Sequence, residues 1–74
     1  MAAVLHLLKA GDHALPLAVI ERDVQAGHDV TVALLPGAAP PSLPGSVRTR
    51  LVTHDLSWAQ LLDLICAADS VISW

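Results

Sequence analysis

The chain has 74 residues, of which 54% are hydrophobic, and it carries a net charge of −3 and one cysteine, Cys66. One cysteine excludes an internal disulfide framework, and four dispersed basic residues with only two aromatic side chains argue against direct nucleic-acid binding. No apolar stretch approaches the roughly 18 residues of a membrane-spanning helix. The N-terminus also lacks the pattern of a secretory signal, so we expect a cytoplasmic protein.

The hydrophobic content is high for a chain of this length. A domain of this size hides only about 60% of the surface that its unfolded chain exposes. The mean hydropathy of +0.59 therefore indicates more apolar material than a small monomer can bury. We expect one domain over residues 1–74 that buries its apolar surplus in an oligomer.

The first half of the chain has the pattern of a strand, a helix and a second strand. Residues 4–8 form a short apolar run that ends in turn chemistry, and residues 30–35 are rich in β-branched side chains. Residues 14–26 between them have helical periodicity, and Gly27 stands where a left-handed residue would end the helix. Short joints predict a βαβ unit with two parallel strands.

The second half has a loop, a strand, a helix and a last strand. Residues 36–46 are rich in proline and glycine and predict an irregular loop. Residues 47–52 alternate between apolar and polar side chains, which predicts a strand near a sheet edge with one wet face. Ser57 and Gln60 have the spacing of a capping box, and residues 71–74 predict a terminal strand.

The second helix carries a broad apolar stripe that we expect to pack on the core, with Trp58 as a packing anchor. Its members are Trp58, Leu61, Leu62, Ile65 and Ala68. Together the elements predict a small two-layer or three-layer α/β sandwich with four mostly parallel strands and two helices. By analogy with doubly wound folds, we expect the strand order 2-1-3-4.

Cys66 is the only residue of the chain that could carry sulfur. It lies in the middle to late turns of the predicted second helix, whereas a reactive thiolate favours a helix N-terminus or a cationic neighbour. We therefore expect a partly buried structural cysteine, and we keep Cys66 as a weak catalytic candidate.

The histidines and tryptophans suggest packing and contact roles rather than catalysis. His6 lies in an apolar strand and needs a hydrogen-bond partner if it is buried, which indicates a core or interface residue. Trp58 and Trp74 are interface candidates with it, because aromatic side chains are enriched at protein interfaces. The four histidines show no i, i+4 pair, so we expect no metal site.

A small-molecule site is an alternative at the turn formed by Gly11, Asp12 and His13. This turn follows the first strand and precedes the first helix, where ligands gather in open α/β sheets. Helix N-terminal N–H groups could hold an anion there, although an aspartate-capped turn explains the residues more simply. The turn matches no nucleotide-binding motif, and we expect no cofactor. Arg48 and Arg50 could contact phosphate or a partner's carboxylates, or simply protect an edge strand.

Three segments of the chain, in this order, match one known pattern. They are LHLLK at 5–9, AGHDVTV at 26–32, and LSWAQLLDL at 56–64 followed by ADSVISW at 68–74. They resemble the LHT opening, the EG-x-x-V entry to the second strand, and the SY-x-x-FVDL helix with its D-x-V-x-SW terminal strand in the DsrH/TusB family of sulfur-relay proteins.

The resemblance implies a DsrE-like α/β fold and a place in a cytoplasmic sulfur-relay complex. Members act with DsrE- and DsrF-like (TusD- and TusC-like) subunits in a heterohexamer that passes persulfide sulfur between cysteines. The sulfur goes either to 2-thiouridine at the wobble position of tRNA or into dissimilatory sulfur oxidation. The partners implied here are those subunits or further copies of the chain.

Two departures from the family pattern decide the role that we expect. The chain is shorter than usual between the second strand and the last helix. Some DsrH-type members carry a cysteine in the first helix, and counting back from Gly27 places Ile20 there. The resemblance then implies a non-catalytic subunit that holds a partner's cysteine in place. The alternatives are a sulfurtransferase that uses Cys66 and an anion-binding module at Gly11–His13.

Overall fold

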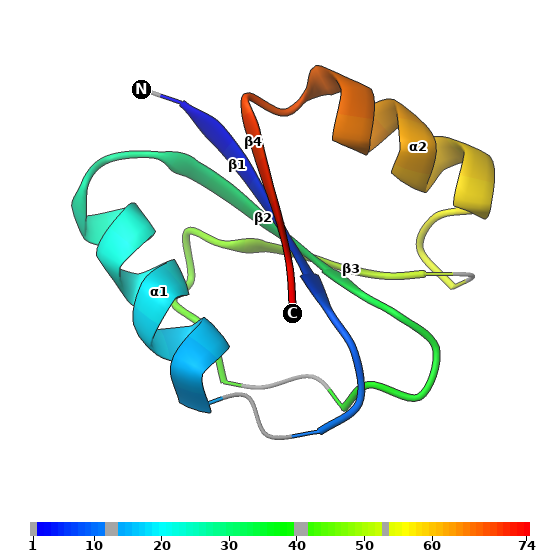
Figure 1. Ribbon diagram of the computed structural model, residues 1–74, viewed down its shortest axis with the longest axis horizontal. Coiled ribbons are helices and arrows are strands. Elements are labelled where there is room, and N and C mark those ends of the chain that lie inside the picture. The colour runs from blue at the N-terminus through cyan, green and yellow to red at the C-terminus, as the bar shows by residue number, and fades with distance from the viewer. Residues whose placement is uncertain (1, 12–13, 40–41, 53) are drawn as a thin grey trace.

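Within the residues that the structure describes, the elements follow the predicted order of strand, helix, strand, strand, helix and strand (Figure 1). The computed structural model describes residues 2–11, 14–39, 42–52 and 54–74. The elements within those residues are β1 (Ala3–Leu8), α1 (Ala14–Gln25), β2 (Asp29–Leu34), β3 (Arg48–Leu51), α2 (Trp58–Ala67) and β4 (Ser70–Ser73).

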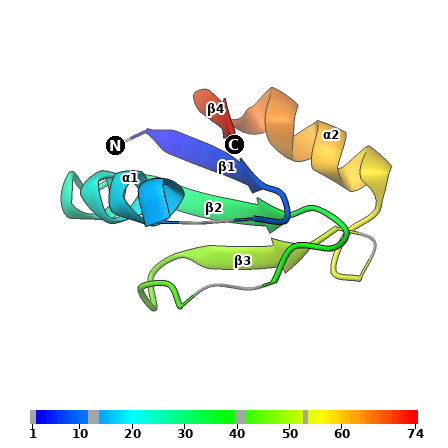
Figure 2. The same ribbon diagram turned by 60° about the horizontal axis from the view of Figure 1, so that its bottom comes forward.

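All four strands are parallel and form one sheet in the order β3-β2-β1-β4. The expected order 2-1-3-4 is wrong. The connection from β2 to β3 contains no helix among its described residues, and it places β3 on the outer side of β2, so β3 is an edge strand as predicted. Helix α2 then leads back across the sheet, so that β4 pairs with β1 (Figure 2). The reversal of strand order therefore lies between β1 and β4.

The two helices cover opposite faces of the sheet. The fold therefore has three layers, one of the two predicted possibilities. Alternate residues of β1 and β2 point to alternate faces. One face packs with α1 around Ile20, and its buried members are Leu8, Ile20, Val30, Val32, Leu34 and Val47. The other packs with α2 around Leu61, and its buried members are Leu5, Ala33, Val52, Leu56 and Leu61. We call these the α1 face and the α2 face.

Local hydrogen bonds fix where each helix begins or ends. Gly27 has a φ of 83°, and its N–H donates to the Val24 carbonyl while the His28 N–H donates to the Asp23 carbonyl. This pair of bonds is a Schellman motif, which ends α1 as predicted. At the start of α2, the Ser57 hydroxyl accepts from the Gln60 N–H and the Gln60 side chain accepts from the Ser57 N–H. The predicted capping box is confirmed.

Helix α2 packs with a narrower stripe than the sequence predicts. Leu61 is buried and Ile65 is half-buried, but Trp58 and Leu62 are 57% and 61% exposed. The prediction that Trp58 anchors the core is therefore wrong. The reason is geometric, since a helix on one face of a four-stranded sheet covers the strands beneath it and leaves its outer flank in solvent.

Neither described helix has the combination of length and apolar character that crossing a membrane requires.

Candidate functional site

His6 lies at the centre of a buried polar network on the α1 face. Its ring is fully buried, and its Nε2 lies 2.9 Å from the Asp23 carboxylate of α1. The Trp74 indole N–H donates to His6 Nδ1 at 3.1 Å. The two ring planes lie within 11° of each other, with their centroids 6.2 Å apart. The network thus joins β1, α1 and the residue that follows β4.

The partners determine the protonation pattern of the imidazole. An indole nitrogen can only donate, so Nδ1 of His6 must accept and carries no proton. The ring hydrogen is therefore on Nε2, where the Asp23 carboxylate accepts it. Both ring nitrogens are occupied, and no described buried side-chain polar atom lacks a partner. An imidazole held in this way is built for packing, because neither nitrogen is available to a substrate.

This arrangement decides between the two roles predicted for His6. A fully buried ring cannot touch another molecule, so His6 is a core residue and its assignment as an interface residue is wrong. Trp74 is half-buried and packs on the α1-face cluster. Sequence reasoning did not identify Asp23, although it follows Ile20 by three positions and so adjoins the buried stripe of α1. A buried histidine in need of a partner was the available signal.

The turn after β1 lies beside the reversal of strand order. Gly11 is exposed and has a φ of 134°, a conformation that favours glycine. Asp12 and His13, which the anion-site alternative needs, lie outside the described residues. The turn follows the carboxyl end of β1, the location predicted for a ligand.

The positions that bear on sulfur transfer differ sharply in accessibility. Cys66 is exposed, so the expectation of a partly buried cysteine is wrong. It lies in the last turn of α2, which has no basic side chain. Ile20 is fully buried at the centre of the α1 face. A thiol at that position would be out of reach of a sulfur donor.

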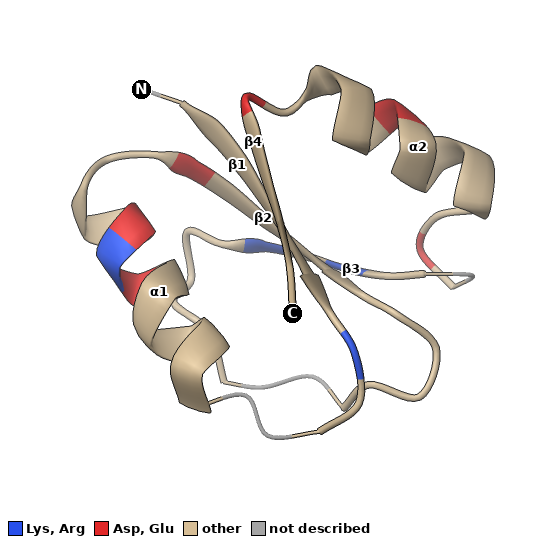
Figure 3. Ribbon diagram, viewed as in Figure 1, with Lys and Arg blue, Asp and Glu red and all other residues tan. Residues whose placement is uncertain are grey.

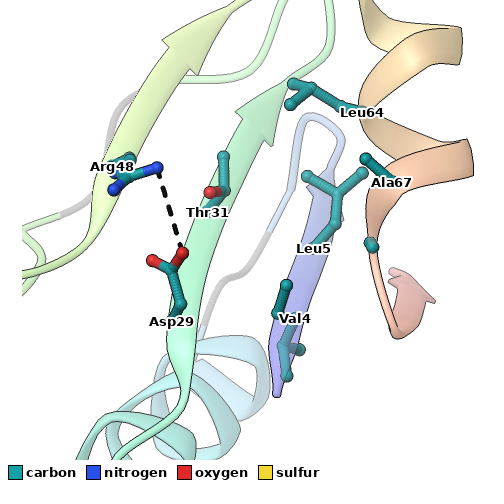
Figure 4. A pocket seen from close by; sticks show the side chains of 9 residues that line it. Val4, Leu5, Asp29, Thr31, Arg48, Leu64 and Ala67 are labelled. Atoms are coloured by element: carbon teal, nitrogen blue, oxygen red, sulfur yellow. Dashed lines mark ion pairs between the residues drawn. The ribbon is translucent and has the colours of Figure 1, made fainter. Parts of the chain in front are cut away.

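A hollow of about 170 Å³ lies on the α2 face, where the strands begin (Figure 4). Arg48 and Asp29 flank it with their charged atoms 3.9 Å apart, and the Thr31 hydroxyl lies beside them. Leu64 and Ala67 of α2 form the apolar wall. The Arg48 and Asp29 side chains are 64% and 43% exposed. The hollow therefore combines a solvated ion pair and a hydroxyl group with an apolar wall.

Exposed large apolar side chains lie mainly on the α2 side of the molecule. Trp58, Leu62 and Val71 are exposed there, and Leu15 is exposed at the start of α1. Trp58 is therefore accessible to a partner, and its role as a contact residue stays a prediction. In the described part of the chain, no group of three or more histidine, cysteine, aspartate or glutamate residues could hold a metal ion.

Comparison of the chain with models of known protein families, with curated proteins and with solved structures found no match. The candidate site therefore has to be interpreted from its own chemistry. That chemistry is a fully satisfied buried network on one face and an incompletely covered apolar face on the other.

Proposed function

We propose that the chain is a non-catalytic subunit of a cytoplasmic sulfur-relay complex, in which it holds a partner's persulfide-carrying cysteine in place. The observation that carries the proposal is the incompletely covered α2 face. Exposed Trp58, Leu62 and Val71 resemble the core of a protein interface rather than the surface of a free monomer. The kind of partner comes from the resemblance to the DsrH/TusB family, which implies DsrE- and DsrF-like subunits.

The buried network of His6 also supports a role in binding rather than catalysis. Asp23 and Trp74 occupy both ring nitrogens, so the histidine that looks most like a catalytic base cannot accept a proton from a substrate. Ile20 fills the place where some relatives have the transferring cysteine, and it is buried. Sulfur transfer through this chain would therefore have to use Cys66.

The exposure of Cys66 favours one alternative, a sulfurtransferase in which this thiolate attacks a donor persulfide. The thiolate would take the outer sulfur atom and release the donor as a thiolate, which leaves a persulfide on Cys66. The position in the last turn of α2 argues against this role, because reactive cysteines favour a helix N-terminus or a basic neighbour and this turn has no basic side chain.

Coexpression with DsrE- and DsrF-like proteins from the same organism tests the proposal. We expect a stable complex in which mass spectrometry, after incubation with a persulfide donor, finds added sulfur on a partner's cysteine and none on Cys66. A Cys66→Ser variant should leave sulfur transfer unchanged. Sulfur on Cys66 together with loss of transfer in Cys66→Ser would establish the sulfurtransferase instead, and failure to form any complex would overturn both.

A deletion strain tests where the sulfur goes. Loss of 2-thiouridine from tRNA in a strain that lacks the chain would assign it to tRNA modification. Unchanged tRNA with slower oxidation of reduced sulfur compounds would assign it to sulfur oxidation.

A further inference from the structure

Strand β4 presents an unpaired edge that carries no charge. Among the described strands it pairs only with β1, and half of its backbone N–H and C=O groups face away from that partner. Its sequence is Ser70-Val71-Ile72-Ser73, without a charged side chain (Figure 3). The Asp69 carboxylate just before it accepts a hydrogen bond from the Ala3 N–H at 2.8 Å, on the β1 side. The outer edge of β4 is therefore open to a further strand.

The opposite edge of the sheet differs in this respect. Strand β3 carries Arg48 and Arg50, both exposed, along its short length. Charged side chains on an edge strand prevent pairing with another sheet, because pairing would bring like charges together and remove them from water. One edge is thus protected and the other is not.

The exposed flank of α2 lies on the same side as the open edge. Helical periodicity places Trp58, Leu62 and Ile65 on one flank of α2, and Asp63 and Ala67 on the other. Asp63 and Ala67 line a hollow together with Arg50, so their flank faces β3. The flank with Trp58 and Leu62 therefore faces β4.

Strand β4 adds an apolar side chain to this flank. Val71 is paired in register with Leu5, whose side chain belongs to the α2-face cluster, so Val71 points to the same face and is 39% exposed. Trp58, Leu62, Ile65 and Val71 together form one uncharged apolar surface next to an unpaired strand. We call it the β4–α2 surface.

We propose that the β4–α2 surface binds a second copy of the chain through a two-fold axis perpendicular to the sheet. Such an axis runs β4 antiparallel to its copy and satisfies the outward backbone groups of both strands. It also keeps both α2 helices on the same face, with their apolar flanks turned toward each other. One symmetry operation thus covers the open edge and the exposed flank together.

Charge is the reason why a second copy fits this surface. The chain has a net charge of −3, so two copies repel each other unless they meet where neither is charged. The β4–α2 surface meets that condition, since none of its side chains and none of the residues of β4 is charged. The pairing buries Trp58, Leu62 and Val71, which also carry the proposed contact with DsrE- and DsrF-like subunits, so a second copy and those subunits compete for this surface, while Leu15 and the hollow beside Arg48 stay exposed. It does not rest on the sulfur-relay proposal.

Sedimentation and light scattering of the purified full chain test the pairing, with two glutamate variants on α2. We expect the wild type to have twice the chain mass of 7.8 kDa. Leu62→Glu should be a monomer, because it places two like charges across the two-fold axis. Ala67→Glu puts the same charge on the opposite flank of the same helix and should stay a dimer. Leu62 and Ala67 are both exposed, so neither variant disturbs the core.

Isotope-filtered NMR on mixed labelled and unlabelled chains identifies the surface directly. We expect intermolecular contacts from the methyl groups of Leu62 and Val71, and slowed exchange of outward β4 amides that is lost in Leu62→Glu. A wild type that is monomeric from micromolar to millimolar concentration would overturn the proposal. So would a dimer that survives Leu62→Glu, or one whose contacts map to other residues.

Discussion

The two faces of the sheet differ in how fully their apolar side chains are buried. On the α1 face, Ile20 and its neighbours are buried, and Asp23 and Trp74 satisfy the buried His6 side chain from within the chain itself. On the α2 face, Leu61 is buried, but Trp58 and Leu62 stay in solvent. The first face is complete as it stands, whereas the second requires contact with another molecule to bury its apolar side chains.

This difference shows how a chain of 74 residues can combine stability with association. A small domain buries only about 60% of the surface that its unfolded chain exposes, so some apolar side chains stay in solvent, and here several of them lie on the α2 face. The buried clusters of both faces stabilise the fold, and the exposed flank of α2 is left for recognition. The comparison predicts that mutations on the two faces will separate effects on folding from effects on assembly.

Truncation of Ile20 should produce the largest effect. Ile20→Ala removes a fully buried side chain at the centre of the α1 face and should cost about 2–5 kcal/mol of unfolding free energy, enough to unfold much of the protein. Leu62→Ala on the α2 face removes an exposed side chain and should change that free energy by less than about 0.5 kcal/mol. Urea titration at concentrations where the chain is monomeric measures both. Equal losses in the two variants would contradict the division between the faces.

Removal of the Asp23 carboxylate should come next. Asp23→Ala leaves the buried Nε2–H of His6 without an acceptor, which should cost about 1–3 kcal/mol. Asp23→Asn keeps an acceptor oxygen at the same place and should lose less. Trp58→Phe leaves Trp74 as the single tryptophan, so its fluorescence reports on this face during urea unfolding. If Asp23→Ala and Asp23→Asn were equally stable, the hydrogen bond to His6 would not contribute.

The sequence predicts the α1 face better than the α2 face, for a physical reason. Helix periodicity identifies Ile20, and glycine at the end of a periodic run identifies the Schellman motif, because both depend on neighbours in the sequence. The choice of which apolar residues of α2 are covered depends on where the sheet ends. The position of the sheet edge depends in turn on strand order, which could not be predicted from the sequence. For this reason the prediction that Trp58 and Leu62 pack on the core is wrong.

Contacts between residues far apart in the sequence could not be predicted either. His6 and Trp74 are separated by 68 positions, and only the pairing of β4 with β1 brings them together. The need of a buried histidine for a partner was predictable, but the identity of that partner was not. The hollow beside Arg48 likewise depends on the unexpected neighbours β2 and β3.

A smaller effect is expected at the end of α1. Gly27→Ala places a side chain at a φ of 83°, which should cost about 1–2 kcal/mol of unfolding free energy. An added Cβ would meet no atom within 4 Å, so the cost is conformational rather than steric. Gly45→Ala is the matched control, because its surroundings are equally open and its φ is not in the left-handed region. Thermal unfolding should show a lower midpoint for Gly27→Ala only.

The smallest effect on folding is expected at the β3 edge, where the α2 face carries charge instead of apolar surface. The Arg48–Asp29 pair spans 3.9 Å between exposed groups, so Arg48→Thr should change the unfolding free energy by less than about 0.5 kcal/mol. Replacement of both Arg48 and Arg50 by threonine keeps strand propensity and removes the charges that protect the edge. We therefore expect the double variant to fold normally but to form species larger than a dimer, which light scattering measures. Because β4 would still pair as in the wild type, growth beyond two copies would come from the second edge. A double variant that remained a dimer would show that the arginines do not protect β3, and that the two edges differ in apolar surface alone.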